Sequence, residues 1–324
     1  MNTLASTCLG STIAIVVAGC GGGTSTMDGG ADGAVDGAVD AGGAGPATFL
    51  YVANYEGDTI SGFEVGEDGA LTEVSGSPFA APSRGFTLAL AAPDRIYMPT
   101  GNGAGATNQI LSFTIDWSTG ALVAGTPLAT TRADGSYGIA ATPSGAFLYV
   151  NQPDAAGTVA GYAVGTSGAL TPLAGSPFAA DGDLAQLAMA PSGELLYVAG
   201  AQRNRVFGMR IGASGALTPV PQGSVTTGPG AADYAENPQH LAVHPGGRFL
   251  YVGNFASGNV AAFAIDPNTG DLTEMAGSPF AAATGVCALA FDRQGQFLYA
   301  GIGGQPAASP SVCTPSASTG RAAR

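Results

Sequence analysis

Tyrosine recurs along this chain at a nearly constant spacing, and this spacing constrains the fold more than any other feature. The intervals are 46, 52, 48, 54 and 48 residues between Tyr51, Tyr97, Tyr149, Tyr197, Tyr251 and Tyr299. A repeat of this length is typical of chains built from similar supersecondary units. We therefore predict one large repeat domain rather than two unrelated smaller ones.

The clearest unit, residues 239–280, contains four short runs with the length of average strands. They are Gln239 to His244, Phe249 to Asn254, Asn259 to Asp266, and a last run from Leu272 to a Gly-Ser-Pro-Phe sequence. Proline and glycine at positions 245 to 247 mark a turn between the first two runs. Each unit therefore indicates four antiparallel strands.

The second run of the unit is apolar on both faces. Phe249, Leu250, Tyr251 and Val252 do not alternate with polar residues, so both sides of this strand should be buried. A parallel α/β sheet would bury both faces too, but it needs crossover helices, and the sequence contains no helical stretch. The pattern predicts an all-β fold, a β-propeller of four-stranded antiparallel blades.

The repeat is incomplete at both ends. The first unit, residues 49–79, supplies only the last three runs of a blade, and the last unit loses its apolar alternation after Ile302. About six blades are visible, of which the last is incomplete. We assign residues 47–324 to the propeller, with a ragged tail from about residue 303.

The first twenty residues have the features of a secretion signal. An apolar segment precedes Val17-Ala18-Gly19-Cys20, which resembles a bacterial lipobox, so Cys20 would be lipidated after cleavage. Residues 1–19 contain no Lys or Arg, which leaves open a short apolar leader with an unrelated cysteine. The first alternative predicts an extracytoplasmic, membrane-anchored lipoprotein, periplasmic or at the cell surface.

Residues 21–46 form a tether of Gly, Ala, Asp and Thr, with aspartate at every fourth position from Asp28 to Asp40. The tether lacks the ligand pattern of a calcium loop. Formal charge is −13, and all ten basic residues are arginine. We therefore expect no nucleic-acid partner and membrane contact only through the lipid anchor. Of the remaining cysteines, Cys287 and Cys313 could pair, although sequence alone does not decide this.

The Phe-Leu-Tyr-Val-x-Asn runs, the Thr/Ser-Gly-Ala-Leu-Thr turns and the Gly-Ser-Pro-Phe endings resemble those of the bacterial lactonase-type β-propellers. That family includes 6-phosphogluconolactonase-like enzymes and is similar to proteins with YVTN-type repeats. The resemblance covers about residues 47–302 and implies seven blades.

The resemblance also implies an active site, which this chain carries only in part. Active members of the family show Pro-Arg-His, then His-Pro-x-Gly, and an Asn-Glu pair after the next strand. Here the Arg position is Gln239 and the Glu position is Phe255. The chain thus lacks a cation for an oxyanion and a carboxylate for general-base catalysis at those positions, and it remains open whether it is an enzyme.

His240 is the best catalytic candidate, because the equivalent positions of other units are Leu88, Gly138, Gln186 and Ala288. The alternative is a histidine that is only hydrogen-bonded at a strand end. His244 lies about 13 Å further along the same strand, so the two cannot share one metal, and we interpret His244 as structural. The innermost strands of a β-propeller surround a central funnel. The substrate-binding candidates are placed at the mouth of this funnel: Gln239, Tyr137, Gln186 and Asn254. No metal or cofactor motif is present.

Two functions compete. The first is a lactone hydrolase, a carboxylic ester hydrolase acting on a sugar-type lactone, with His240 polarising the carbonyl or activating water. The second is a non-catalytic extracytoplasmic propeller that binds a glycan, a peptide or a protein. In both cases we expect a monomer.

Overall fold

The computed structural model describes residues 15–19, 48–54, 57–66, 68–82, 85, 87–91, 93–100, 108–130, 138–152, 157–180, 182, 184–230, 232–292 and 295–303. These residues form strands and turns, with no helix among them. Within this part of the chain there is accordingly no helical segment with the length and apolar character that a membrane span requires.

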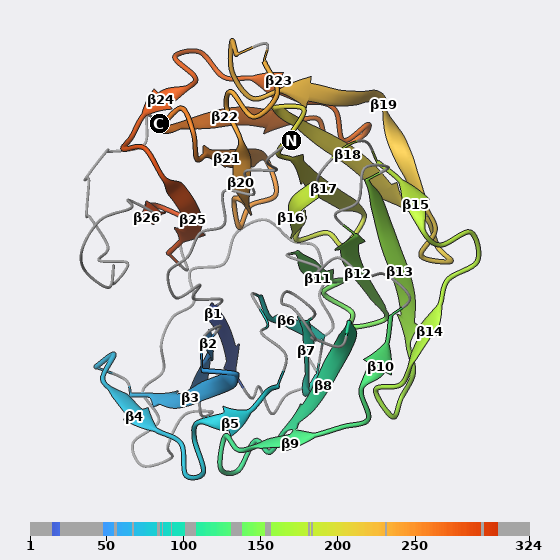
Figure 1. Ribbon diagram of the computed structural model, residues 1–324, viewed down its shortest axis with the longest axis vertical. Coiled ribbons are helices and arrows are strands. Elements are labelled where there is room, and N and C mark those ends of the chain that lie inside the picture. The colour runs from blue at the N-terminus through green and yellow to red at the C-terminus, as the bar shows by residue number, and fades with distance from the viewer. Residues whose placement is uncertain are drawn as a thin grey trace, which may run out of the picture.

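Six antiparallel sheets follow one another around a common axis (Figure 1). The first contains β1 (Ile15–Gly19), β2 (Thr48–Asn54), β3 (Thr59–Val65), β4 (Leu71–Glu73) and β5 (Phe79–Ala80). The second contains β6 (Ala89–Ala91), β7 (Arg95–Pro99), β8 (Gln109–Ile115), β9 (Leu122–Ala124) and β10 (Leu128–Ala129). The third contains β11 (Ile139–Ala141), β12 (Phe147–Gln152), β13 (Thr158–Val164), β14 (Leu170–Pro172) and β15 (Phe178–Ala179).

The second half of the ring repeats this order. The fourth sheet contains β16 (Leu184–Met189), β17 (Leu195–Gly200), β18 (Arg205–Ile211) and β19 (Leu217–Thr226). The fifth contains β20 (Pro238–Val243), β21 (Phe249–Asn254), β22 (Asn259–Ile265), β23 (Leu272–Glu274) and β24 (Phe280–Ala281). The sixth contains β25 (Val286–Phe291) and β26 (Leu298–Ile302). Among the described residues there are thus five full blades and a two-stranded sixth sheet, which confirms the predicted propeller.

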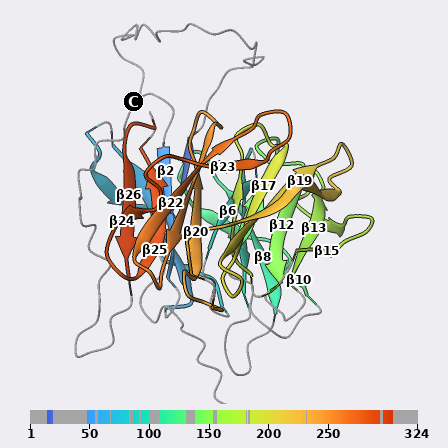
Figure 2. The same cartoon turned by 90° about the horizontal axis from the view of Figure 1, so that it is seen from above.

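The core lies between neighbouring sheets, as expected for strands that are apolar on both faces. Each cluster of buried apolar residues in the described chain draws on two adjacent sheets; the one between the fourth and fifth sheets includes Tyr197 and Phe263. Strand β17 is buried at every position. Figure 2 shows the same ring from the side, with the strands running across its thickness. Face-to-face stacking therefore buries both sides of the central sheets such as the fourth, whereas β2 of the first sheet alternates between buried and half-buried positions and β26 of the sixth has no buried position.

In three blades the outer strand is in two pieces at a Gly-Ser-Pro-Phe sequence, and in the second blade at Gly125-Thr126-Pro127-Leu128. In three blades the serine hydroxyl of this sequence accepts a hydrogen bond from the third strand: Gly62 N to Ser77 at 3.1 Å, Gly161 N to Ser176 at 2.9 Å and Ala262 N to Ser278 at 3.0 Å. The side chain replaces a backbone acceptor and interrupts the ladder. In the fourth blade, Gln222-Gly223-Ser224-Val225 stands at this place and β19 is continuous.

The repeating tyrosines connect neighbouring blades. The first four of the six are fully buried, and each of these four hydroxyls donates to the carbonyl of a turn glycine in the next sheet. The pairs are Tyr51 and Gly120 at 2.7 Å, Tyr97 and Gly168 at 2.7 Å, Tyr149 and Gly215 at 2.7 Å, and Tyr197 and Gly270 at 2.9 Å. Burial raises the pKa of these hydroxyls, so they stay protonated and act as donors.

Removing one of these hydroxyls should weaken the ring measurably. We expect Tyr149→Phe to lower the free energy of unfolding by about 2 kcal/mol, because the buried Gly215 carbonyl loses its donor. Tyr299→Phe is the matched control, since Tyr299 holds the same repeat position in the sixth sheet but is 51% exposed. Urea unfolding of both variants would measure the difference. Equal effects would contradict the role of the buried hydrogen bond.

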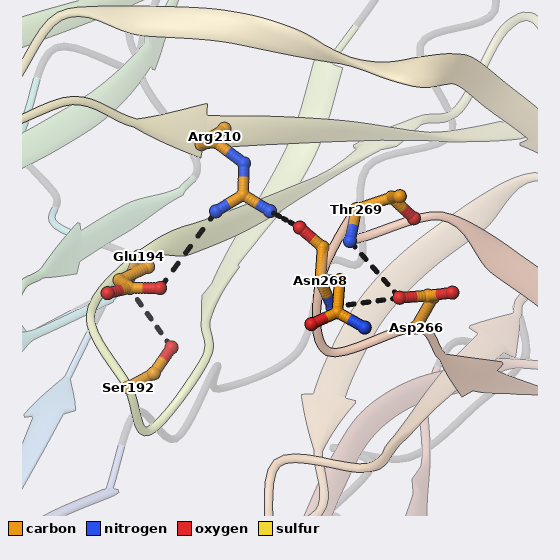
Figure 3. A network of polar contacts seen from close by, with 6 residues as sticks. All are labelled: Ser192, Glu194, Arg210, Asp266, Asn268 and Thr269. Atoms are coloured by element: carbon orange, nitrogen blue, oxygen red, sulfur yellow. Dashed lines mark hydrogen bonds and ion pairs between the residues drawn. The ribbon is translucent and has the colours of Figure 1, made fainter.

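A second, exposed contact joins the fourth and fifth blades (Figure 3). Arg210 lies 3.9 Å from Glu194 within the fourth blade, and its guanidinium donates to the carbonyl of Asn268 in the next blade. The Asp266 carboxylate holds that turn by accepting from the backbone amides of Asn268 and Thr269. Each charged side chain of this network, Arg210, Glu194 and Asp266, has a partner within it. We therefore interpret the network as a connection between blades rather than as a ligand site.

One prediction about the ends is wrong. The first blade does not lack its innermost run: β1 pairs with β2, from Ile15 opposite Val52 to Gly19 opposite Thr48. The sequence Ile-Val-Val-Ala-Gly is rich in β-branched residues, which favour strands, and it satisfies the backbone edge of β2. Cleavage before Cys20, which would remove residues 1–19 together with β1 and leave Cys20 as the lipidated N-terminus, is a statement about processing and stays a prediction.

Several other predicted features lie outside the described residues. These are the lipidated Cys20, the tether at 21–46, Cys313 and the tail beyond residue 303.

Candidate functional site

Three inner strands carry an irregularity at the same place, near the end where each begins. The register shifts between Leu184 and Leu187 in β16, between Pro238 and His240 in β20, and between Val286 and Ala288 in β25. Such bulges re-aim side chains and are common beside functional sites. Two predicted binding residues, Gln186 and Gln239, lie inside these irregular stretches. We call Gln186, Gln239 and His240 the rim residues.

The rim residues lie on neighbouring inner strands. Ala185 and Leu241, which flank Gln186 and His240 in sequence, belong to one buried cluster between the fourth and fifth sheets. Gln239 and His240 are consecutive on β20, and Asn254 pairs across the same hairpin with Pro238. The fold therefore brings Gln186, Gln239, His240 and Asn254 into one region, whereas Tyr137 lies outside the described residues.

His240 connects the fifth and sixth sheets. Its Nδ1 accepts a hydrogen bond of 3.2 Å from the backbone amide of Leu289 in β25. Burial lowers the pKa of His240 to about 4, so the ring is neutral at pH 7. Because Nδ1 is an acceptor in this bond, the single proton of the neutral ring resides on Nε2. His240 can therefore donate a hydrogen bond through Nε2, but it has no unused lone pair with which to take a proton from water.

Gln186 is held in place through the backbone around it. The Asn151 side chain donates to the carbonyls of Leu184 and Ala185 and accepts from the amide of Gly138. A side chain at Gly138 would come within 2.9 Å of the Gln186 Cα atom, so only glycine permits this approach of the third blade. The buried Oε1 of Gln186 receives no hydrogen bond from the described residues. It is an acceptor that a bound hydroxyl group could use.

Gln239 and Asn254 are tied to the loop that precedes β20. The Gln239 amide donates to Asn237 Oδ1 at 2.6 Å. Asn254 is fully buried, and its amide nitrogen donates to the carbonyl of Thr227 at 2.8 Å and to Asn259 Oδ1 at 2.7 Å. Only the Oδ1 atom of Asn254 is left without a partner among the described residues.

Sequence reasoning missed Glu236 and Asn204, which organise this loop. Glu236 is 3% exposed, and its backbone carbonyl accepts from the amide of Ala256, directly after Phe255. Asn204 accepts through Oδ1 from the amides of Glu236 and Asn237. The signal was the long insertion of residues 226–237, which has no counterpart in other units and carries an acidic residue, Glu236, four positions before His240.

His244 has the structural role predicted for it. Its Nδ1 accepts from the Gly246 amide at 2.9 Å, and its Nε2 lies 3.1 Å from the Gly295 carbonyl of the sixth sheet. The ring packs edge-on against Phe249 and Phe291. Elsewhere in the described chain, no group of three or more His, Cys, Asp or Glu side chains could hold a metal.

Comparison with known proteins supports the fold at two levels. A family profile described as "Lactonase, 7-bladed beta-propeller" matches residues 96–300, more than half of the chain. A search of curated proteins returned no match.

Solved structures with the same fold include the periplasmic gluconolactonase PpgL of Pseudomonas aeruginosa, at 20% identity and a TM-score of 0.61, covering 78% of this chain and 75% of that one. A Bacteroides fragilis protein, provisionally assigned as a 6-phosphogluconolactonase, matches at 21% identity and a TM-score of 0.61, covering 79% and 74%. Sqt1 of Chaetomium thermophilum, bound to the N-terminus of ribosomal protein L10, matches at 18% identity and a TM-score of 0.52, covering 79% and 66%. Because propellers with different roles match, these likenesses show the fold alone.

The profile extends from β7 of the second sheet to β26 of the sixth, including β20 with His240 and the hairpin that carries Asn254. The repeat, the stacked sheets and the profile all agree, and the chain therefore belongs to the lactonase family of seven-bladed β-propellers.

Proposed function

We propose that this protein is an extracytoplasmic lactone hydrolase acting on an unphosphorylated sugar-type lactone at the rim residues. The observation that carries the proposal is the state of His240. Its ring is neutral at pH 7, and its Nδ1 accepts from the Leu289 amide, so Nε2 carries the proton and is the ring's donor. A donor of this kind stabilises the oxyanion that forms when water attacks a lactone carbonyl.

In this reaction a water oxygen bonds to the carbonyl carbon and the carbonyl oxygen gains negative charge. His240 Nε2–H donates to that oxygen, which lowers the free energy of the tetrahedral intermediate. The ring C–O bond then breaks, and the alkoxide leaving group takes up the proton that the water lost. The product is an open-chain hydroxy acid. The unpartnered Gln186 Oε1 offers an acceptor for a substrate hydroxyl.

The preference for an unphosphorylated substrate follows from charge. Phosphate recognition needs clustered Arg or Lys, or helix N-termini. The family's Arg position is Gln239, whose neutral amide already donates to Asn237. A chain with a formal charge of −13 also repels phosphate. The proposed lipid anchor at Cys20 would place the protein outside the cytoplasm, away from sugar phosphates, where we propose that it acts as a monomer.

A non-catalytic binding role is the second candidate, favoured by the uncharged residues at two family positions, Gln239 and Phe255. A propeller of this kind would bind a surface glycan, a peptide or a protein through the same rim.

A panel of phosphorylated and unphosphorylated lactones separates the two functions. We expect turnover of unphosphorylated lactones at pH 7 and a loss of about 100-fold in kcat/KM for His240→Ala, which removes the donor. His244→Ala is the matched control: it removes the other histidine, which lies outside the rim. If the wild type opens no lactone faster than the buffer does, the protein is not a lactonase.

A further inference from the structure

Glu236 has a buried carboxylate, and only one of its two oxygens accepts a hydrogen bond from the described residues. The side chain is 3% exposed, and Oε1 accepts a hydrogen bond of 2.9 Å from the amide of Gly230. Oε2 is buried as well, yet no donor from the described residues reaches it. No ion pair among these residues involves Glu236 either. A buried carboxylate in this condition is costly unless a cation or another donor accompanies it.

The loop is shaped around this carboxylate. A Cβ atom at Gly228 would lie 2.6 Å from both carboxylate oxygens, and one at Gly230 would lie 2.8 Å from Oε1. Two glycines are thus required for the backbone to approach the charge so closely. The carboxylate is held inside the loop and is not a surface group that happens to fold inward.

A second buried oxygen without a donor lies at the same loop. Asn254 is fully buried, and its Oδ1 has no partner in the described part of the chain. Its amide nitrogen donates to the carbonyl of Thr227, the residue directly before Gly228. The two orphaned atoms, Glu236 Oε2 and Asn254 Oδ1, thus belong to side chains that both contact the segment of Thr227 and Gly228, and each needs a donor or a positive ion.

We propose that the loop of residues 226–237 binds a calcium ion through Glu236 Oε2 and Asn254 Oδ1, with backbone carbonyls and water completing the shell. Calcium takes carboxylate, amide and backbone oxygens in flexible geometry, whereas transition metals prefer nitrogen and sulfur ligands that this loop does not offer. With a single carboxylate, the affinity should be in the range of extracellular modules, a Kd of about 10⁻⁴ to 10⁻³ M.

This ion would act on the rim without taking part in the chemistry. Glu236 leads directly into Asn237, whose side chain accepts from Gln239, the neighbour of His240. An ion that fixes the loop therefore fixes the start of β20.

The test uses the full chain, stripped with EDTA, and follows thermal unfolding while calcium chloride is added. We expect a saturable rise in Tm of about 3 °C at 10 mM calcium and a smaller rise with magnesium, which demands stricter geometry. Glu236→Gln should abolish the shift. Asp233→Asn is the matched control and should keep it, because Asp233 is an exposed carboxylate of the same loop whose contact is with Gln202.

Isothermal titration of the stripped wild type keeps the proposal falsifiable if Glu236→Gln does not fold. One calcium site per chain supports the proposal. No saturable heat and no shift in Tm would mean that buried water serves both oxygens, and the proposal would fail. An equal shift in wild type and Glu236→Gln would overturn it too, since the ion would then bind elsewhere.

Discussion

Lowering the pH from 7 to 4 should destabilise the folded protein by about 3 kcal/mol through His240 alone. The pKa of His240 is lowered from 6.5 to about 4 by burial. Below pH 6.5 the unfolded chain takes up a proton at this residue while the folded chain does not. The unfolded state binds more protons over this window, so stability rises with pH between about 4 and 6.5 and is lost as the pH falls.

Urea unfolding of wild type and His240→Gln at several pH values between 4 and 7 isolates this contribution, because all other titrating groups are common to both proteins. As the pH falls, the wild-type free energy of unfolding should fall more steeply than that of the variant, and above about pH 6.5 the difference between the two should no longer depend on pH. Parallel curves would contradict the prediction. Titration of the wild-type imidazole by NMR gives an independent check: a pKa near 6.5 would show that the ring is not desolvated.

The lowered pKa also bears on the proposed reaction. A neutral imidazole with its proton on Nε2 is a hydrogen-bond donor over the whole range from pH 5 upward, so the donor role needs no titration near pH 7. The Leu289 amide, which belongs to the next sheet, fixes the tautomer. The packing of the sixth sheet against the fifth therefore sets the chemical state of a residue on β20.

The architecture could be predicted from the sequence because the repeat is long and the second strand of the repeat unit is apolar on both faces. The tyrosine spacing and the recurring Thr/Ser-Gly-Ala-Leu-Thr turns were visible in the sequence as two separate features. The structure shows that they are the two ends of one contact, as in Tyr149 and Gly215. Spacing alone could not show this, because each tyrosine bonds to a glycine of the next unit rather than of its own.

Site residues could be predicted where they differ from the equivalent positions of the other units. They could not be predicted in a loop that has no equivalent in those units. His240 stood out because no equivalent position of the other units carries a titratable side chain, and Gln239 stood out because it occupies the family's Arg position. Glu236 lies in a loop without counterparts, so no comparison between units could mark it. The bulges were hidden as well: in β16 and β25 apolar residues continue on both sides, and in β20 the polar Gln239 and His240 were interpreted as site residues rather than as a bulge. The pairing of β1 with β2 was missed because its apolar residues also fit a leader.

Asn204→Ala should produce the largest loss of stability of any substitution considered, about 4 kcal/mol. Asn204 is 3% exposed and holds the loop of residues 226–237 with both ends of its amide. Oδ1 accepts from the amides of Glu236 at 2.9 Å and Asn237 at 3.1 Å, and Nδ2 donates to the Ala232 carbonyl at 2.6 Å. Alanine leaves these groups unsatisfied, each at roughly 1 kcal/mol. Asn204 also has a φ of 53°, where alanine costs a further 1 kcal/mol or so.

Asn204→Gly separates the two effects. Glycine adopts this backbone conformation without steric cost but makes no side-chain hydrogen bonds, so it should destabilise by about 1 kcal/mol less than alanine. Urea unfolding measures both values, and limited proteolysis should cut the loop of residues 226–237 faster in both variants than in wild type. If the loop were held mainly by its own turns, alanine would cost only the backbone term and glycine almost nothing. Apart from Asn204, Glu236 is bonded to Gly230 of the same loop, and Asn237 is bonded to Gln239 on β20. Loss of the Asn204 side chain should therefore loosen the loop and the start of β20 together.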